Sequence, residues 1–519
     1  MTKIKQHPLK VVLVGILAIQ LLLIAFCNLT LIDKNIDCDN AKLFVHTMNM
    51  WREKSLLIPG WSYTTTLELD CSSILALPLY GILGNIYLAY GIANILFVLI
   101  LIAVLFYMFE GEKAEYPLLT ANLVCIPYSL GMLAYFNMMF FCGSQYIMKI
   151  LIPLLFVGVL LQMDGRRGEH KKRLIVMSVI YIGLVLLTSV SSGVYVTFTG
   201  LIPVIAAYAL YKLFKYERVH PLFYVLVALT GLCLIAGVMV NNAVMGGARG
   251  NSSMVLVNVY QALANVSSCI FGIFELFGGI AYDMTLPILS LQGIAIVARA
   301  CFTILFAVCG IIAARRVIKG QADLRMILLV AIGVWNLFVL LMTNTRAGSS
   351  TYEFRYHLIG MIPIMCVTAI LLLEGLGKWN RVQQTVLVAG GAMMILVVTA
   401  LSFRTVIRHE DEQVELKEVC EYLQDMPLEY VYMYDGSNDA DMCRLISGDE
   451  EITYLCVVPD GLTYAYDYHS KYELGPIQSE NAIMVVDNAV YDFGDQYDAF
   501  GYTFTRFAVV GNRSLYHFE

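Results

Sequence analysis

The sequence is poor in charge for its length. Only 14% of its 519 residues are Asp, Glu, Lys or Arg, whereas 59% are hydrophobic. Soluble domains carry roughly 25% charged residues, so this composition indicates an integral membrane protein. The net charge of −6 sums residues from both sides of a bilayer and says little about partners. No basic patch interleaved with aromatic residues is present, so the sequence predicts no nucleic-acid partner.

The sequence also lacks the cysteine spacings of zinc sites and of redox motifs. None of its thirteen cysteines forms a Cys-x-x-Cys pair, and most lie in apolar runs, where a thiol is a small core residue. Cys38 and Cys71 differ because each adjoins an acidic residue, and a disulfide between them remains one alternative. No small-residue cleavage site follows the first apolar run, which therefore predicts a retained membrane span.

Long apolar runs dominate the first four fifths of the chain. A bilayer core of about 30 Å needs about 20 apolar residues per helix. This rule predicts eleven spans, at 11–32, 86–109, 117–137, 146–163, 174–190, 194–214, 221–240, 286–314, 326–343, 357–375 and 383–403. A further short helix at the membrane surface is expected at 71–85.

Lysine and arginine predict the orientation of these spans. With alternating spans, the basic clusters all fall on one side, which is then the cytoplasm; they lie at 3–10, 166–173, 212–218, 315–325 and 378–381. The N-terminus is therefore expected in the cytoplasm. The opposite side receives the loops 33–72, 241–283 and 344–356, and everything after 404. The 241–283 loop is expected to be a flexible connection or a lid over an acceptor.

The last 115 residues change character, because acids, tyrosines and short β-rich runs replace the apolar spans. The run 409–426 predicts a helix, and strands are expected at 430–435, 452–458, 482–487 and 504–510. The predicted fold is mainly α. It combines a polytopic transmembrane bundle of about eleven spans (1–403) with a small extracytoplasmic α/β domain (404–519).

The first external loop, 33–72, holds the most suggestive polar residues. Asp37 and Asp39 precede an amphipathic run at 40–54, and Glu68 and Asp70 follow it. The amphipathic run predicts an interfacial helix lying on the membrane. A carboxylate fixed there can remove a proton from a hydroxyl or coordinate a divalent cation, for which Asp37 and Asp39 are the candidate ligands.

The spacing of these residues resembles the first external loop of GT-C membrane glycosyltransferases, which take sugars from polyprenyl-phosphate donors. The likeness is to the aminoarabinose and mannosyl transferases, including glycosyltransferase family 39. Four elements carry it: Asp39-Asn40-Ala41, then Leu56-Leu57-Ile58-Pro59, then Glu68, then Leu77-Pro78-Leu79-Tyr80. The resemblance implies that Asp39 is the catalytic carboxylate, with Asp37 assisting, and that Glu68 or Asp70 is a partner acid.

Two positions depart from the family pattern. Asn40 replaces the usual second acid, although Asp37 can supply that charge two residues earlier. Leu69 stands where some members have a lysine after the acid. Contacts to the donor phosphate are therefore expected from elsewhere in the chain.

The loop before the tenth predicted span supplies such contacts. GT-C proteins often carry an Arg-Tyr dipeptide before a late span with a proline inside it, and Arg355-Tyr356 with Pro363 resembles this pattern. Arg346 lies in the same loop. A guanidinium suits a phosphate because it donates in a planar fork, and the alternative is that Arg355 pairs with Glu353 or a lipid headgroup.

The predicted function is transfer of a sugar from a polyprenyl-phosphate donor to an extracytoplasmic acceptor. A polymerase or ligase of surface polysaccharides shares this donor chemistry and remains an alternative. A transporter or flippase is a second one, although transporters need broken spans or charges near mid-membrane, whereas polar residues here gather on one external face.

Overall fold

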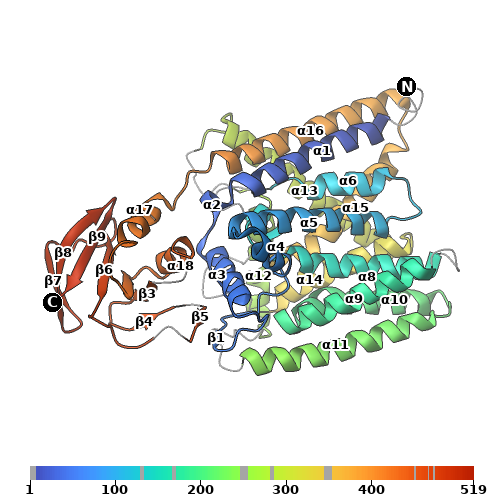
Figure 1. Ribbon diagram of the computed structural model, residues 1–519. Coiled ribbons are helices and arrows are strands. Elements are labelled where there is room, and N and C mark those ends of the chain that lie inside the picture. Colours follow the sequence, from blue (N-terminus) through green and yellow to red (C-terminus); the bar gives the residue numbers. More distant parts are fainter. Residues whose placement is uncertain are drawn as a thin grey trace.

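The computed structural model describes residues 8–128, 134–165, 171–245, 255–280, 286–343, 354–448, 452–465, 467–470 and 474–519. Long helices form a bundle, and a smaller domain built from the last hundred residues covers part of one end of it (Figure 1). We call this the domain end and the opposite one the far end. The first described residue, Pro8, lies at the far end, whereas the C-terminus lies in the domain.

Ten helices cross the bundle as single segments. They are α1 (Pro8–Thr30), α5 (Ile86–Met108), α8 (Ile147–Gly165), α9 (Lys171–Ser192), α10 (Ile202–Phe214, continuing the π-turn Thr197–Leu201), α11 (Pro221–Met245), α13 (Leu291–Ile318), α14 (Leu324–Met342), α15 (Leu358–Leu376, after the 3₁₀ turn Phe354–His357) and α16 (Arg381–Arg408). All are long and apolar enough to span a membrane. Each matches a span predicted from the sequence.

The predicted span 117–137 is not one helix. The chain forms α6 (Glu115–Val124), leaves the helix, and resumes as α7 (Ala134–Phe140). The Asn122 side chain donates to the carbonyl of Leu13, and the Asn28 side chain donates to that of Phe140. Leu13 and Asn28 are fifteen residues apart on α1, or about 22 Å. The broken segment therefore still crosses the bundle, which gives eleven crossings in the described chain.

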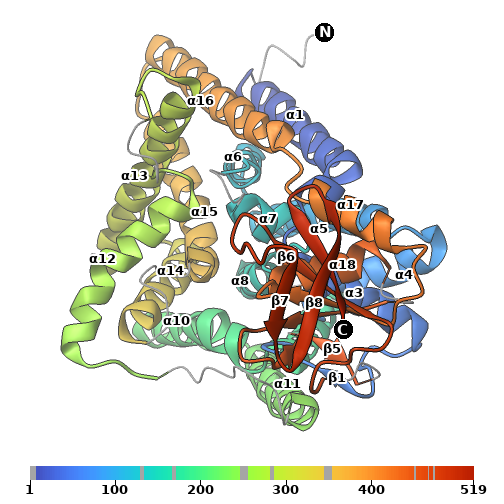
Figure 2. The same cartoon turned by 90° about the vertical axis from the view of Figure 1, so that its left-hand side faces the viewer.

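The expectation that 241–283 is a flexible connection or a lid did not include the long helix within it. Residues Val259–Leu276 form α12, an eleventh long apolar helix. Its start lies at the domain end, where the Asn265 side chain donates to the carbonyl of Thr343. Viewed from that end, α12 is seen from its side and runs across the view, whereas α8 and α15 are seen nearly end-on (Figure 2). We conclude that α12 lies along the domain end and does not cross the bundle. The described chain therefore has eleven crossings.

The C-terminal domain is a mixed sheet with helices on one face. Strands β2 (Tyr430–Tyr434), β3 (Thr453–Val457), β6 (Ala482–Asp487) and β8 (Tyr502–Val510) confirm the four predicted strands, and β4 (Thr463–Tyr464), β7 (Gln496–Ala499) and β9 (Arg513–Phe518) complete the order β4-β3-β2-β6-β9-β8-β7. β2 pairs in parallel with β3 and β6, and the other pairs are antiparallel. The predicted helix is shorter than expected, at Val414–Leu423 (α17), and α18 (Ser437–Ile446) was not predicted.

The first loop connects the two parts of the molecule. It contains α2 (Ile32–Asn35), α3 (Cys38–Arg52), the short strand β1 (Trp61–Ser62) and α4 (Ser73–Leu83), the last confirming the helix expected at 71–85. β1 pairs with β5 (Tyr468–His469) of the C-terminal domain, and α3 packs against α18. Arg52 donates to the carbonyl of Gly448 across the same junction.

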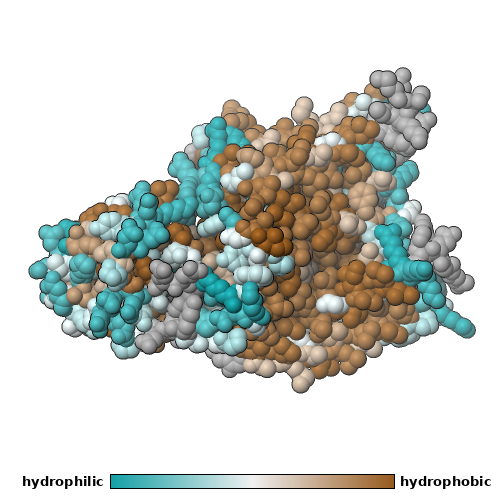
Figure 3. All heavy atoms as spheres, in the orientation of Figure 1, coloured by the Kyte–Doolittle hydropathy of each residue, from teal (hydrophilic) through white to brown (hydrophobic). Residues whose placement is uncertain are grey.

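The surface divides as a membrane protein requires. A broad apolar band covers the bundle, whereas the C-terminal domain and the rim of the far end are largely hydrophilic (Figure 3). Hydrophobic side chains on this band stay exposed, for example Leu22, Ile82 and Met239. Lipid tails satisfy such a surface, so the protein is a multi-pass membrane protein.

Candidate functional site

Helix α3 packs against protein on two sides, whereas the sequence predicted an amphipathic helix facing lipid. Ten of its fifteen residues are buried, including the polar His46 and Asn49, because α4 packs on one side and α18 of the C-terminal domain on the other. The amphipathic pattern therefore reports burial between two parts of one protein. This position makes α3 a rigid support for the acids at its start.

Asp37 and Asp39 have different surroundings. Asp37 is the N-cap of α3, and its Oδ1 accepts from the backbone and side-chain N–H groups of Asn40, each at 2.8 Å. Burial and the neighbouring charge of Asp39 raise the pKa of Asp37, although the Asn40 hydrogen bonds oppose this. Asp39, in the first helical turn, is 55% exposed and lies 3.1 Å from Nζ of Lys42. Asp37 thus shapes the helix, while Asp39 presents a carboxylate to an incoming molecule.

Lys42 links α3 to the acids of the C-terminal domain. Its own burial lowers its pKa, but the negative charges of Asp39, Asp441 and Asp467 outweigh that effect and raise it overall. Burial raises the pKa of Asp441 to about 6, against the opposing charges of Arg444 and Lys42. We call Asp39, Lys42, His46, Glu68, Asp441 and Asp467 the junction cluster.

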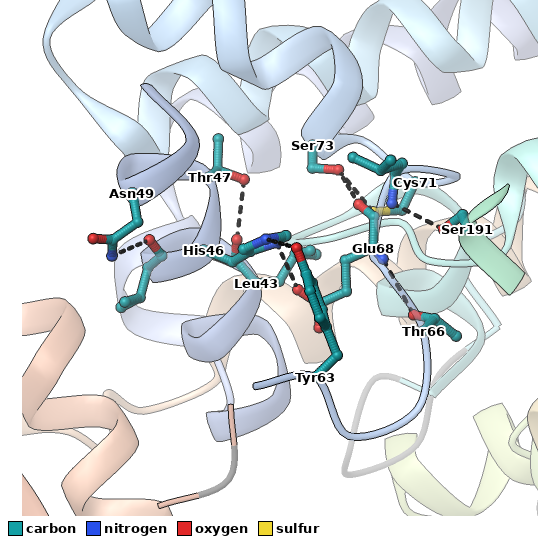
Figure 4. A network of polar contacts seen from close by, with 12 residues as sticks. Leu43, His46, Thr47, Asn49, Tyr63, Thr66, Glu68, Cys71, Ser73 and Ser191 are labelled. Atoms are coloured by element: carbon teal, nitrogen blue, oxygen red, sulfur yellow. Dashed lines mark hydrogen bonds and ion pairs between the residues drawn. The ribbon is translucent and has the colours of Figure 1, made fainter. Parts of the chain in front are cut away.

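Glu68 closes the cluster from the first loop. Its Oε2 lies 3.2 Å from Nδ1 of the fully buried His46, and the other ring nitrogen of His46 lies 3.3 Å from the Tyr63 hydroxyl (Figure 4). The backbone at Glu68 has φ +56°, a strained value for a residue with a side chain. Its carbonyl accepts from Cys71 and Ser73, which holds this turn in place. His46 lies on the same face of α3 as Asp39 and Lys42, one turn after Lys42. The sequence analysis did not identify it as a site residue.

Asp467 is the contribution of the C-terminal domain that sequence analysis missed most clearly. It is 4% exposed, and its backbone carbonyl accepts from Arg444 at 2.7 Å. Burial and then the charge of Glu68 raise its pKa to about 8, against Lys42 and hydrogen bonds from Thr64. The Asp467 carboxyl therefore binds a proton more tightly than a solvent-exposed aspartate does.

Asp70 has a supporting role in this geometry. Its two oxygens accept from the hydroxyls of Ser191 and Ser192, each at 2.7 Å, and Oδ1 lies 3.4 Å from Nζ of Lys149. Asp70 is 1% exposed, so its charge is matched by one cation and two hydroxyls. It ties the first loop to the end of α9.

Arg355 and Tyr356 lie beyond the ion pair of Asp70 and Lys149, at the other end of a row of tyrosines. The ammonium of Lys149 is 5.3 Å from the centre of the Tyr146 ring, and Tyr195 lies between Tyr146 and Tyr356, with ring centres 6.5 and 6.2 Å away. Arg355 lies over Tyr356 at 5.8 Å and close enough to Tyr195 to interact electrostatically. Arg346 lies outside the described residues.

The structure thus brings the predicted residues into two groups on either side of the segment 68–70. Glu68 faces the junction cluster with Asp39, whereas Asp70, two residues on, faces Lys149 and the tyrosines that lead to Arg355. Asp37 caps the N-terminus of α3 and belongs to neither group. Its partner Asn40 accepts a hydrogen bond from the backbone N–H of Gly143.

Two further expectations concern metals and disulfides. Within the described residues, no group of three or more His, Cys, Asp or Glu side chains is arranged to hold a metal ion. Asp37 and Asp39 turn to different partners, so this geometry does not favour them as a shared cation site. Cys38 and Cys71 are both free thiols, so no disulfide joins them. Burial raises the pKa of Cys71 to about 12, which makes it inert.

Comparison with known proteins places the fold. No protein-family model matches the sequence, and no curated protein does. Among solved structures, the chain has the fold of GT-C membrane glycosyltransferases, as the first-loop resemblance implied. The similar structures include ArnT from Cupriavidus metallidurans in its apo state (TM-score 0.55, 10% identity, 97% of each chain) and bound to undecaprenyl phosphate (0.59, 11%, 98% of each chain).

The chain is also similar to the apo oligosaccharyltransferase of Archaeoglobus fulgidus, with a TM-score of 0.51 and 12% identity. That likeness covers 84% of this chain and 64% of the archaeal one, so the present chain spans less than two thirds of its length. At 10–12% identity these comparisons establish the fold.

Proposed function

We propose that the protein is a membrane glycosyltransferase that moves a sugar from a polyprenyl-phosphate donor to an acceptor hydroxyl at the domain end. The observation that carries the proposal is the fold likeness over 98% of both chains to an ArnT structure bound to undecaprenyl phosphate. The placement of an exposed carboxylate, Asp39, at the start of a buried helix supports it.

In this proposal, Asp39 is the general base. Its exposed side chain is reachable by an acceptor, and Lys42 fixes its direction. As the hydroxyl oxygen attacks the anomeric carbon, the carboxylate takes up the hydroxyl proton, and the bond from carbon to phosphate oxygen breaks. Glu68 and His46 hold the loop that faces this base.

The departing phosphate gains charge in the transition state, and Arg355 is proposed to stabilise it. The ring of Tyr356 lies 5.8 Å from the guanidinium of Arg355, and Tyr195 is close enough to interact with it electrostatically. Asp70 is proposed to act indirectly, by holding Lys149 and the start of this group in place.

The test is turnover of donor by the purified full chain in lipid nanodiscs. Polyprenyl-phosphate sugars of several kinds are supplied with an extract of envelope glycans and lipids, and released polyprenyl phosphate is quantified. Acceptor-dependent release from at least one donor supports the proposal. Donor binding without release from any of them points instead to a transporter.

The predicted orientation belongs to the same proposal. The basic clusters at the far end favour the cytoplasm there and an extracytoplasmic C-terminal domain. Alternation over eleven crossings is consistent with this assignment, since Pro8 and the domain lie at opposite ends.

A further inference from the structure

One cation lies deep in the bundle, away from both groups described above. Arg299 follows the first residue of α13 by eight positions, or about 12 Å, in the half of the bundle nearer the domain end. Its side chain is 0% exposed. In the predicted span 286–314 it is the single charged residue, a signal that is visible in the sequence alone.

The guanidinium of Arg299 is incompletely paired. Nε donates to the hydroxyl of Ser402 on α16 at 3.2 Å. Nη1 and Nη2 are buried without a hydrogen-bond partner, and no aspartate or glutamate of the described chain forms an ion pair with them. A buried charge without a counter-ion is costly, and such residues inside membrane helices generally serve a ligand or a pathway.

The surroundings of Arg299 place it beside the break between α6 and α7. Phe302, one turn further along α13, packs against Tyr128 in the residues after α6, with ring centres 6.2 Å apart. Phe403, next to Ser402, packs against Phe136 of α7 at 5.8 Å. The arginine thus lies where α13, α16 and an interrupted helix meet, among aromatic rings.

The two unpaired Nη groups define the ligand chemistry. They form one edge of the planar fork that binds two oxygens of a phosphate. Aromatic walls and an apolar outer band suit a ligand with a hydrocarbon tail, rather than a free anion that would have to leave water.

We propose that Arg299 is the anion-binding residue of a lipid-phosphate site formed by α13, α16 and α7, next to Tyr128. Polyprenyl phosphate is the lipid if the proposed glycosyltransferase function holds, and a bilayer phospholipid presents the same phosphate chemistry. The site is distinct from the junction cluster and from Arg355.

Binding to the full chain in phosphatidylcholine nanodiscs tests the site. Polyprenyl phosphate, phosphatidylglycerol and inorganic phosphate are titrated separately against the parent, Arg299→Gln and the control Arg316→Gln, which removes an arginine from the far end of the same helix. We expect Arg299→Gln to bind polyprenyl phosphate about 10- to 100-fold more weakly, the effect of losing a charge-assisted contact. The control should bind like the parent.

The binding results for the two lipids and for inorganic phosphate decide whether the Arg299 site exists. Arg299-dependent binding of either lipid supports the site, and dependence for polyprenyl phosphate alone identifies it with the donor. Equal binding of both lipids by parent and Arg299→Gln overturns it, as does Arg299-dependent binding of inorganic phosphate alone. Donor turnover is measured separately, so a protein that binds lipid through Arg299 without transferring sugar refutes the proposed function and not the site.

A stability measurement separates ligand binding from a structural role. Without added lipid, removing an unpaired buried charge should raise the melting temperature of Arg299→Gln and of Arg299→Met. With saturating polyprenyl phosphate, the parent should gain more than either variant. Variants that melt lower than the parent in both conditions would indicate a structural arginine and overturn the proposal.

Discussion

The buried carboxyl of Asp467 predicts that the junction between the two parts of the protein weakens as pH rises. Its pKa is raised to about 8 by burial and by Glu68, whereas an aspartate in an unfolded chain titrates near 4. Folding therefore takes up a proton between these values. Because the pKa of Asp467 is higher in the folded protein than in the unfolded chain, the stabilisation is complete below about pH 4. It is lost progressively as pH rises to about 8.

The magnitude follows from the same two values. Each pH unit within that window changes the free energy of unfolding by at most about 1.4 kcal/mol for one group, so the loss from pH 5 to pH 8 is at most about 4 kcal/mol. Asp467→Asn removes this dependence, since the amide stays neutral. Its curve of melting temperature against pH should be flatter than that of the parent between pH 5 and pH 8.

Intrinsic fluorescence of the purified protein during heating is a suitable assay, because Trp61 lies in the junction, 6.4 Å from the ring of His469. Asp492→Asn is a matched control in the same domain, since Asp492 is exposed and its replacement can still accept from the N–H of Gly494. Parallel curves for the parent, Asp467→Asn and Asp492→Asn would refute the reasoning about Asp467.

The remaining predictions concern the cap, the junction, the phosphate contact and the orientation. Asp37→Ala should destabilise the protein by about 1 kcal/mol and lower its melting temperature, whereas Asp37→Asn keeps a cap acceptor and should not; equal losses would contradict the capping role. Gly60→Ala places a methyl group on Ser470 at a residue with φ +78°, so limited proteolysis should release the C-terminal domain faster, and an unchanged rate would count against the β1–β5 contact. Arg355→Lys should lower donor turnover about tenfold or more despite keeping the charge, and Arg355→Ala turning over at the parent rate would exclude Arg355 as the phosphate contact. Reporter fusions after Arg404 should be active only outside the cytoplasm, and activity only inside would reverse the orientation.

The sequence predicted the crossings because burial in lipid imposes a length and a composition on each of them. The expectation of a single span at 117–137 rested on the absence of charged residues there and missed the break between α6 and α7, although Pro127 inside the run is a residue that commonly ends or kinks a helix. The polar groups that the break leaves are satisfied by distant residues: the Tyr135 hydroxyl donates to the carbonyl of Val124, and the Gln20 side chain donates to that of Asn122. Such partners follow from packing rather than from local pattern.

The candidate site was predicted less completely than the fold. Asp39 and Glu68 were found because family motifs and loop position mark them. Lys42, His46 and Asp467 were not, since their significance arises from the docking of the C-terminal domain on α3, a contact between residues about 400 positions apart. The same docking explains why an amphipathic helix expected on lipid is buried within the protein.

The central claim is that Asp39 is the base of a sugar transfer. The most direct measurement compares donor turnover by the parent, Asp39→Asn and Asp33→Asn, the last being an exposed acid six residues earlier. We expect Asp39→Asn to lose at least about 100-fold in rate while keeping its melting temperature and donor binding, and Asp33→Asn to turn over like the parent. Turnover by Asp39→Asn within a few-fold of the parent would contradict the claim and leave Asp39 as a solvated partner of Lys42.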